Sequence, residues 1–125
     1  MSTVALKKEL TLALSVKDRA ASAAWYRKHL GFEEIFSIEE AGWTELSTQI
    51  PGVTLGLGDT EDAAPGNCVP VFGVEDITTA RAALEAESVS FDGETMTIDG
   101  MVSLATFFDP DNNALMLAQD LSGQS

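Results

Sequence analysis

Residue types that commonly carry out chemistry are sparse in this sequence and stand far apart. His29 is the single histidine and Cys68 the single cysteine among 125 residues. His29 follows Lys28 near the end of a helical stretch, where we expect a partly exposed helix residue rather than a ligand or base. Cys68 has no base beside it, so we expect a buried structural thiol and no disulfide within the chain. The sequence therefore predicts neither a nucleophilic pair nor a thiolate metal cluster.

Glu45, in the stretch GWTELS, is the one ionisable side chain that strand alternation places on an inward face, close to Trp43. A carboxylate there could act as a lone general base or acid. It could equally hold a cationic group of a ligand, with the Trp43 ring adding a cation–π contact. A third, structural alternative is that Glu45 pairs with a nearby Lys or Arg or faces solvent. All three alternatives stay open at the level of sequence.

Other polar stretches resemble reactive motifs but lack an essential partner. The acidic runs at 59–62 and 109–111 are typical of a solvated linker and of an Asx-rich turn. The segment PGVTLGLGD has glycines but neither the lysine nor the helix of a phosphate-binding loop. Ser103 has no base near it in the sequence. We expect none of these stretches to be a catalytic centre.

The composition is that of a globular chain with a strong acidic excess. The formal net charge is −13, with seven Lys and Arg residues against 20 Asp and Glu residues. Seven cationic residues are too few to neutralise a nucleic-acid backbone, so we expect no nucleic-acid partner. The charge favours a cationic ligand over an anionic one, although solubility or a salt-rich cytoplasm is the simpler explanation.

Apolar stretches in the chain are short. None approaches the roughly 20 residues that span a bilayer, so we expect no membrane partner. The start, MSTVALKKELTLALSV, has no continuous apolar core and no small-residue cleavage site, so we expect no signal peptide. These features together predict a cytoplasmic location.

Hydrophobic alternation and turn residues predict the order of elements in the first half. Residues 9–16 alternate with a period of two, as a strand does. Asp18 is placed to cap a helix that ends at Gly31, with Trp25 and Tyr26 on its apolar stripe. Three shorter strands are expected after the helix, at 33–39, 43–48 and 53–58.

The same order recurs after a polar linker at 59–67. A strand in CVPVFGV leads into a helix capped by Asp76, and strands are expected in VSFDGE, TMTIDGMVSLATFF and NALMLAQ. Val16-Lys17-Asp18 aligns with Val74-Glu75-Asp76 at an offset of 58 residues, and Tyr26 then aligns with Leu84, which indicates an internal repeat. The predicted fold class is α+β, with two tandem βαβββ modules at about 9–58 and 68–119 in a single domain, 1–125.

A ligand cleft is expected from this duplication. One helix over a four-stranded sheet leaves a sheet face uncovered, so neither module is expected to be stable alone. Paired, the modules would form a concave mixed sheet with the helices outside and a cleft inside. Alternation assigns to the cleft, as candidate ligand-binding residues, Thr11, Ala13, Trp43, Glu45, Thr54, Val69, Leu104, Thr106, Phe108 and Met116.

Two motifs carry a resemblance to a known family. The first is V-x-D…S-x-x-W-Y-R…L-G-F, and the second is F-x-D-P-D-x-N. In this sequence they are Val16, Asp18, Ser22, Trp25, Tyr26, Arg27, Leu30, Gly31, Phe32, Phe107, Asp109, Pro110, Asp111 and Asn113. With the βαβββ duplication, the chain resembles the vicinal oxygen chelate superfamily, which includes glyoxalase I, extradiol dioxygenases, fosfomycin-resistance proteins and bleomycin-binding proteins. The motifs are caps, helix core and turn residues, so they imply the fold more than the chemistry.

The resemblance also implies where metal ligands would stand. Metal enzymes of the family place a histidine on the first strand of each module and a glutamate after the D-P-D-G-N turn. The matching positions here are Thr11, Val69 and Met116. A threonine hydroxyl is a weak neutral ligand, valine has no donor atom, and a thioether suits soft metals such as Cu(I). We therefore expect no metal and no cofactor.

The sequence favours a binding protein over an enzyme. The first hypothesis is a metal-free protein that sequesters an apolar, aromatic or cationic small molecule in the cleft, as the bleomycin-binding branch of the family does. The alternatives are a glyoxalase-like lyase or isomerase, or a dioxygenase, that uses an unidentified metal site or Glu45, and an interaction module with a vestigial cleft. The resemblance further implies a homodimer. The ligand itself is not identified by the sequence.

Overall fold

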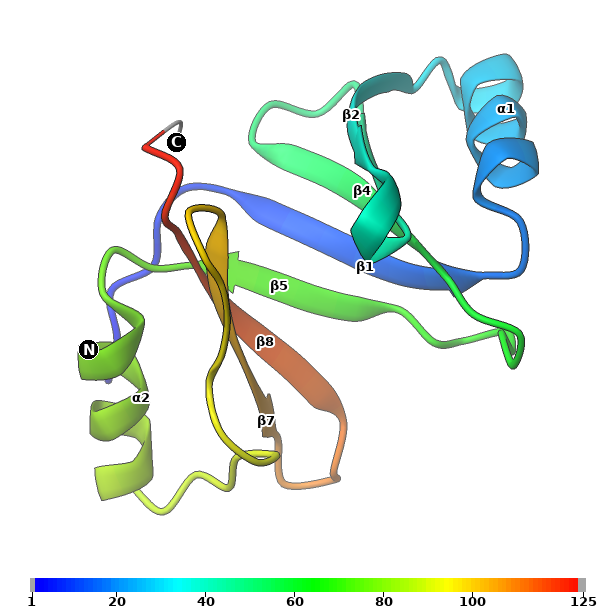
Figure 1. Ribbon diagram of the computed structural model, residues 1–125. Helices are drawn as coiled ribbons and strands as arrows, with labels where there is room; N and C mark the ends of the chain where they lie inside the picture. The colour runs from blue at the N-terminus through cyan, green and yellow to red at the C-terminus, as the bar shows by residue number, and fades with distance from the viewer. Residues whose placement is uncertain (1, 124–125) are drawn as a thin grey trace. The chain divides into compact units, whose positions relative to one another are not determined.

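The computed structural model describes residues 2–123, which fold into two units (Figure 1). The first unit is Leu10–Val69, and the second comprises residues 2–9 together with 70–123. Each unit contains one βαβββ module, as the repeat predicts, so the α+β fold class with two such modules is confirmed. The prediction of a single domain and of a cleft between the modules stays a prediction.

The first unit is a four-stranded mixed sheet with one helix. Its elements are β1 (Leu10–Val16), α1 (Arg19–Leu30), β2 (Glu33–Ile38), the 3-10 turn η1 (Glu39–Ala41), β3 (Trp43–Ser47) and β4 (Val53–Asp59). The strand order is β2-β3-β4-β1, with β1 parallel to β4 and the other pairs antiparallel. All three predicted strands after the helix are present at nearly the predicted bounds.

Helix α1 begins and ends where the sequence places its caps. The Asp18 carboxylate accepts a hydrogen bond from the backbone N–H of Ala21 at 3.0 Å, which satisfies a free donor of the first turn. Gly31 ends the helix with a φ of 73°, a left-handed conformation that costs glycine little. Both cap predictions are confirmed.

Helix α1 covers one face of the first sheet. The buried residues Leu46, Leu55 and Leu57 of this face pack with Tyr26 of the helix. The predicted apolar stripe of the helix is only partly buried. Tyr26 packs on the core, whereas Trp25 is 54% exposed. Trp25 instead contacts Tyr26 edge-on, with ring centroids 5.2 Å apart.

The second unit repeats this arrangement. Its elements are β5 (Val69–Gly73), α2 (Ile77–Ala86), β6 (Met96–Ile98), β7 (Val102–Phe108) and β8 (Ala114–Asp120). The strand order is β5-β8-β7-β6, with β5 parallel to β8. Asp76 caps α2 as Asp18 caps α1, and Leu84 packs on the second core as Tyr26 packs on the first. The offset of 58 residues therefore aligns structurally equivalent positions.

The turn between β7 and β8 is held by one aspartate. Both Asp111 and Asn113 donate their backbone N–H groups to Oδ1 of Asp109, each at 2.9 Å. The side-chain hydrogen bond from Asn113 is the main cause of the lowered pKa of Asp109. Asn112 has a φ of 67°, so asparagine supplies the left-handed residue of this turn, a conformation that asparagine adopts more readily than most residues.

Several sequence expectations are wrong. The stretch TMTIDGMVSLATFF is not one strand, because a turn at Asp99 and Gly100 divides it into β6 and β7. Cys68 is exposed rather than buried, because it stands just before β5 and outside both cores. The stretch VSFDGE is not a strand and forms a single bridge from Phe91 to Phe107, because Asp92 and Gly93 turn the chain there. Among residues 2–123, no helix is long and apolar enough to cross a membrane.

Candidate functional site

The face of the first sheet that α1 leaves uncovered carries half of the predicted site residues. Leu55 and Leu57 point to the helix, so their neighbours along β4 point the other way. The strand pairing sets Thr11 beside Thr54, Ala13 beside Gly56 and Gly56 beside Glu45. We call this surface the Glu45 face; it is made of Thr11, Ala13, Trp43, Glu45, Thr54, Gly56 and Gly58. Alternation therefore places Thr11, Ala13, Trp43, Glu45 and Thr54 on one face, as the structure has them, and their role in ligand binding stays a prediction.

Four side chains on the Glu45 face form one hydrogen-bonded array. The Trp43 indole Nε1–H donates to Oε1 of Glu45 at 3.0 Å. The Thr54 hydroxyl donates to Oε2 of the same carboxylate at 2.9 Å. The Thr11 and Thr54 hydroxyl oxygens are 2.9 Å apart. All four residues are half-buried, so the carboxylate is held in one position and still reached from outside.

Trp43 lies flat against the sheet because two glycines make room for it. A Cβ built on Gly56 would overlap atoms of the six-membered part of the indole ring. A Cβ on Gly58 would lie 3.5 Å from ring atom Cε3, which is ordinary contact. Gly56 is thus the closer support of the ring, and it keeps the indole N–H within reach of Glu45.

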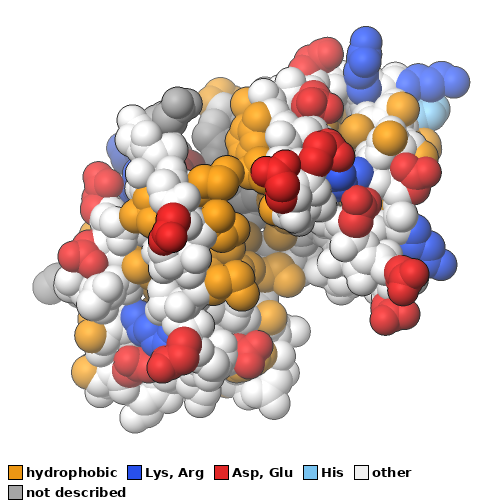
Figure 2. Space-filling view, in the orientation of Figure 1, with side chains coloured by type: hydrophobic (Ala, Val, Ile, Leu, Met, Phe, Trp, Pro, Cys, Tyr) orange, Lys and Arg blue, Asp and Glu red, His pale blue; other side chains and the backbone are white. Residues whose placement is uncertain are grey.

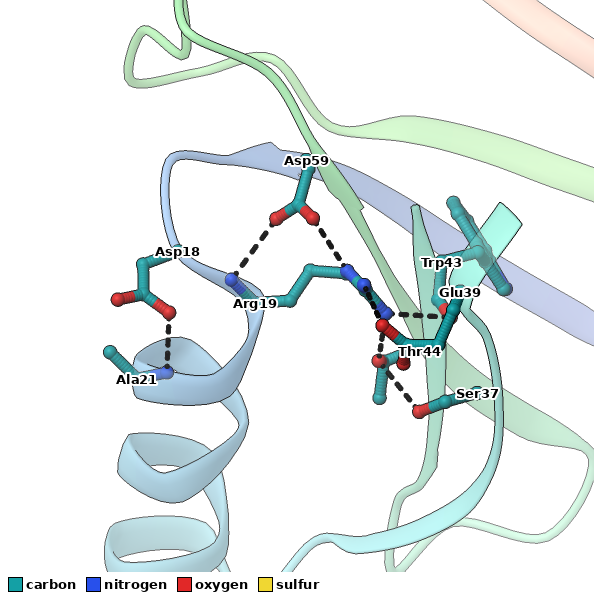
Figure 3. Close-up of polar contacts among 8 residues, drawn as sticks. All are labelled: Asp18, Arg19, Ala21, Ser37, Glu39, Trp43, Thr44 and Asp59. Carbon is teal, nitrogen blue, oxygen red and sulfur yellow. Dashed lines mark hydrogen bonds and ion pairs between the residues drawn. The ribbon is translucent and has the colours of Figure 1, made fainter. Parts of the chain in front are cut away.

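On the opposite side of β3, Arg19 joins four segments of the first unit (Figure 3). Its Nε donates to Asp59 at 2.7 Å, and its Nη2 donates to Glu39 at 3.1 Å. Its Nη1 donates to the Trp43 carbonyl oxygen at 3.1 Å and to the Thr44 hydroxyl at 2.9 Å. The side chain is only 13% exposed. The guanidinium group therefore fixes the backbone from which Trp43 projects.

The ion pair between Arg19 and Asp59 shifts the pKa of both residues. The hydrogen bond from Arg19 is the main cause of the lowered pKa of Asp59, and that carboxylate in turn raises the pKa of Arg19. A hollow of about 440 Å³ lies over this network, lined also by Lys17, Glu34 and Ser37. Arg19 uses most of its donors within the protein, so we assign it a structural role.

Asn67 closes a loop of the first unit onto β1. Its Oδ1 accepts from the Ser15 backbone N–H at 2.8 Å, and its Nδ2 donates to the Ser15 carbonyl oxygen at 3.1 Å. A hollow of about 300 Å³ lies between this loop and the end of β1. No sequence motif marks Asn67 or Arg19, because their partners lie 52 and 40 residues away.

The remaining predicted site residues belong mainly to the second unit. Ala105, Phe107 and Leu117 pack on α2, so the alternating residues of β7 and β8 occupy the other face of that sheet. These residues are Leu104, Thr106, Phe108 and Met116, with Thr106 directly opposite Met116. Val69 is the first residue of β5. The assignment of Val69 and these four residues to a ligand site stays a prediction.

The residues at the metal positions of the family do not fit a hard divalent ion. The Thr11 hydroxyl already has Thr54 as a partner, Val69 has no donor atom, and Met116 offers only a thioether. Within the described part of the chain, no three His, Cys, Asp or Glu side chains lie close enough together to hold a metal ion. His29 is exposed on α1, with its ring centroid 4.9 Å from that of Trp25.

Acidic side chains are spread widely over the protein. In the view of Figure 2, Asp and Glu side chains are scattered over the surface and Lys and Arg side chains are few. The predicted solvated linker at 59–62 is corrected in one respect, since Asp59 ends β4 and pairs with Arg19. On the face that this view shows, the acidic side chains are not gathered into one patch.

The chain belongs to the Glyoxalase/Bleomycin resistance protein/Dioxygenase superfamily, whose sequence profile matches residues 10–117. The βαβββ duplication and the resemblance drawn from the sequence agree with this membership. A search of curated proteins by sequence finds no match.

Several solved structures share the fold. The methylmalonyl-CoA epimerase of Mycobacterium tuberculosis is 16% identical, with a TM-score of 0.68 over 96% of this chain and 92% of that chain. A variant of the Streptomyces coelicolor methylmalonyl-CoA epimerase, in complex with 2-nitronate-propionyl-CoA, is 19% identical, with a TM-score of 0.70 over 93% and 99%. A superfamily member from Vibrio splendidus is 20% identical, with a TM-score of 0.64 over 93% and 100%. At such identities the likeness concerns the fold alone.

Proposed function

We propose that this protein binds a small apolar, aromatic or cationic molecule without a metal ion, and that the ligand contacts the Glu45 face. The observation that carries the proposal is the hydrogen-bonded array, in which an aromatic ring and a carboxylate are held side by side. An apolar surface with a few fixed polar groups is typical of small-molecule sites. The misfit of Thr11, Val69 and Met116 to a hard metal supports the metal-free part.

An enzyme is the second candidate, favoured by the methylmalonyl-CoA epimerases among the structures that share the fold. In that case Glu45 would move a proton at a carbon next to a carbonyl group. Such a step needs donors or a cation to stabilise the negative charge that develops on the carbonyl oxygen. The donors of Trp43, Thr54 and Thr11 are already used within the array, so binding is the better-supported function.

Fluorescence of Trp43 tests the proposal directly. A Trp25→Phe background removes the other tryptophan, which is exposed on α1. We expect uncharged and cationic naphthalene probes to change Trp43 emission saturably in protein stripped of metal by a chelator. The metal-free proposal would be overturned by two results together. Protein purified without chelators would contain stoichiometric Ni, Zn, Mn or Fe, and no probe would bind once this metal was removed.

Superfamily membership further leads us to infer a homodimer, and the cytoplasmic location is proposed on the sequence grounds given above. Sedimentation at micromolar concentration is expected to give twice the mass of the chain. A monomer under these conditions would remove the dimer from the proposal and leave the ligand site unaffected.

A further inference from the structure

We infer that the ligand is an ammonium compound, a primary or secondary amine carried on an aromatic or apolar group, whose N–H groups donate to Glu45. This inference rests on the proposed function and narrows its three ligand classes to one. It follows from the direction of each hydrogen bond in the array.

The array fixes which groups donate. Thr54 has one hydroxyl hydrogen and gives it to Glu45, so in its contact with Thr11 it can only accept. Thr11 must therefore be the donor in that contact. The Trp43 indole has a single N–H, which also points to Glu45. The direction runs from Thr11 to Thr54 to Glu45, with Trp43 donating from the other side.

Around the Glu45 carboxylate, only acceptors are left for a ligand. Ser47, which pairs with Thr54 on the same side of the sheet, gives its hydroxyl hydrogen to the Glu33 carbonyl oxygen at 3.3 Å. Each carboxylate oxygen of Glu45 keeps lone-pair capacity beyond its one bond, and the Thr11 oxygen keeps its lone pairs. Ala13, Gly56 and Gly58 add no polar side-chain atom to the described surface. Ser15, exposed at the far end of β1, can either donate or accept and so does not discriminate. A ligand group that binds at the Glu45 carboxylate must therefore bring the hydrogen atoms.

Among ligand groups that can donate a hydrogen bond, the negative charge of Glu45 favours an ammonium group. A charge-assisted hydrogen bond between N⁺–H and a carboxylate is roughly twice as strong as a neutral one. The fixed Trp43 ring beside the carboxylate adds a surface that attracts a cation and stacks with an apolar or aromatic group. A carboxylate or phosphate ligand would instead meet Glu45 with like charge and no donor. The net charge of −13 acts in the same direction.

Four probes with a common naphthalene body test the inference: naphthylmethylamine, its N,N,N-trimethyl derivative, naphthylmethanol and naphthoate. We expect the amine to bind best and naphthoate worst. The trimethyl probe keeps the charge but has no N–H, so it separates hydrogen bonding from cation–π attraction. Binding is measured by Trp43 emission in the Trp25→Phe background, and this comparison needs no variant of the site.

Glu45→Gln supplies the second measurement. It keeps the shape of the side chain but removes the charge, so we expect about a tenfold or greater loss of affinity for the amine, and little change for naphthylmethanol. Glu40→Gln removes the same charge from an exposed position and should change neither affinity. The near-ultraviolet circular dichroism of each variant reports whether the fold is kept.

The outcomes are distinguishable. If naphthylmethanol or naphthoate binds as tightly as the amine, the ammonium inference is overturned and the proposed binding function stands. An amine that binds no better than its trimethyl derivative would show that N–H donation is not used, which also overturns the inference. If none of the four probes binds, the proposed function fails together with the inference.

Discussion

Gly56 shows how a missing side chain shapes the Glu45 face. The Trp43 ring occupies the space that a Cβ at this position would need, so ring position and glycine depend on each other. The ring position in turn sets the hydrogen bond from Trp43 to Glu45. The polar geometry of the face therefore depends on a residue that has no polar side-chain atom.

Gly56→Ala is expected to displace the Trp43 ring and break its hydrogen bond to Glu45. We predict a changed Trp43 emission and near-ultraviolet circular dichroism in the Trp25→Phe background, with about a tenfold or greater loss of amine affinity. Gly58→Ala is the matched control, because a Cβ there meets the same ring at 3.5 Å. Equal spectra for both variants and the parent would contradict the assigned role of Gly56.

Asp59 is one residue that makes the stability of the fold depend on pH. Arg19 lowers the pKa of Asp59 in the folded state below its unfolded value of about 3.9. The pair therefore adds stability above about pH 4, and this contribution is lost as the pH falls through the folded-state pKa.

We predict that Asp59→Asn lowers the melting temperature at pH 7, and that the difference from the parent shrinks between pH 4 and pH 3. Thermal melts across this range provide the measurement, with the exposed Asp62→Asn as control. A difference that stays constant down to pH 3 would show that Asp59 stabilises the fold by some means other than its charge.

At the scale of elements, α1 packs on the side of the first sheet that lies opposite the Glu45 face. Leu57 is fully buried between β4 and this helix. Leu57→Ala should cost about 2–5 kcal/mol of unfolding free energy, because the cavity it leaves is enclosed. Ile50→Ala, at a side chain that is 63% exposed, should cost far less. Urea titrations measure both changes, and similar losses would mean that Leu57 is not part of a tightly packed core.

The sequence predicts these elements well because their signals are local. Alternation in LTLALSV places Thr11 and Ala13 opposite the leucines, and Asp18, Asp76 and Gly31 mark helix ends that the structure confirms. Arg19 is not predicted, because its contacts join segments that meet only after the sheet has formed. The exposure of Trp25 and Cys68 is likewise set by tertiary packing, which a local pattern of apolar residues does not contain.

For the candidate site, the sequence predicts which residues share a face but not how they are bonded. The sequence allows three alternatives for Glu45, and the structure gives this residue two uncharged donors, Trp43 and Thr54. Neither donor is a lysine or arginine, so the hydrogen bonds of Glu45 are not ion pairs with a cationic side chain. Register between β3 and β4, which sets these contacts, depends on the whole sheet.

At the scale of the whole molecule, the net negative charge should attract a cationic ligand at long range. Exposed charges are screened beyond about 8 Å at physiological ionic strength. We predict that raising the salt concentration from 0.02 M to 0.5 M weakens binding of the amine probe, while binding of naphthylmethanol changes little. Equal salt dependence of the two probes would indicate that charge plays no part in recognition.

The most direct test of the central claim is a titration of metal-stripped Trp25→Phe protein with naphthylmethylamine, followed by Trp43 emission. We predict a saturable change in emission that is the same with and without chelator, and an affinity that Glu45→Gln weakens about tenfold or more. A flat titration that becomes saturable only when a divalent metal is added would contradict it.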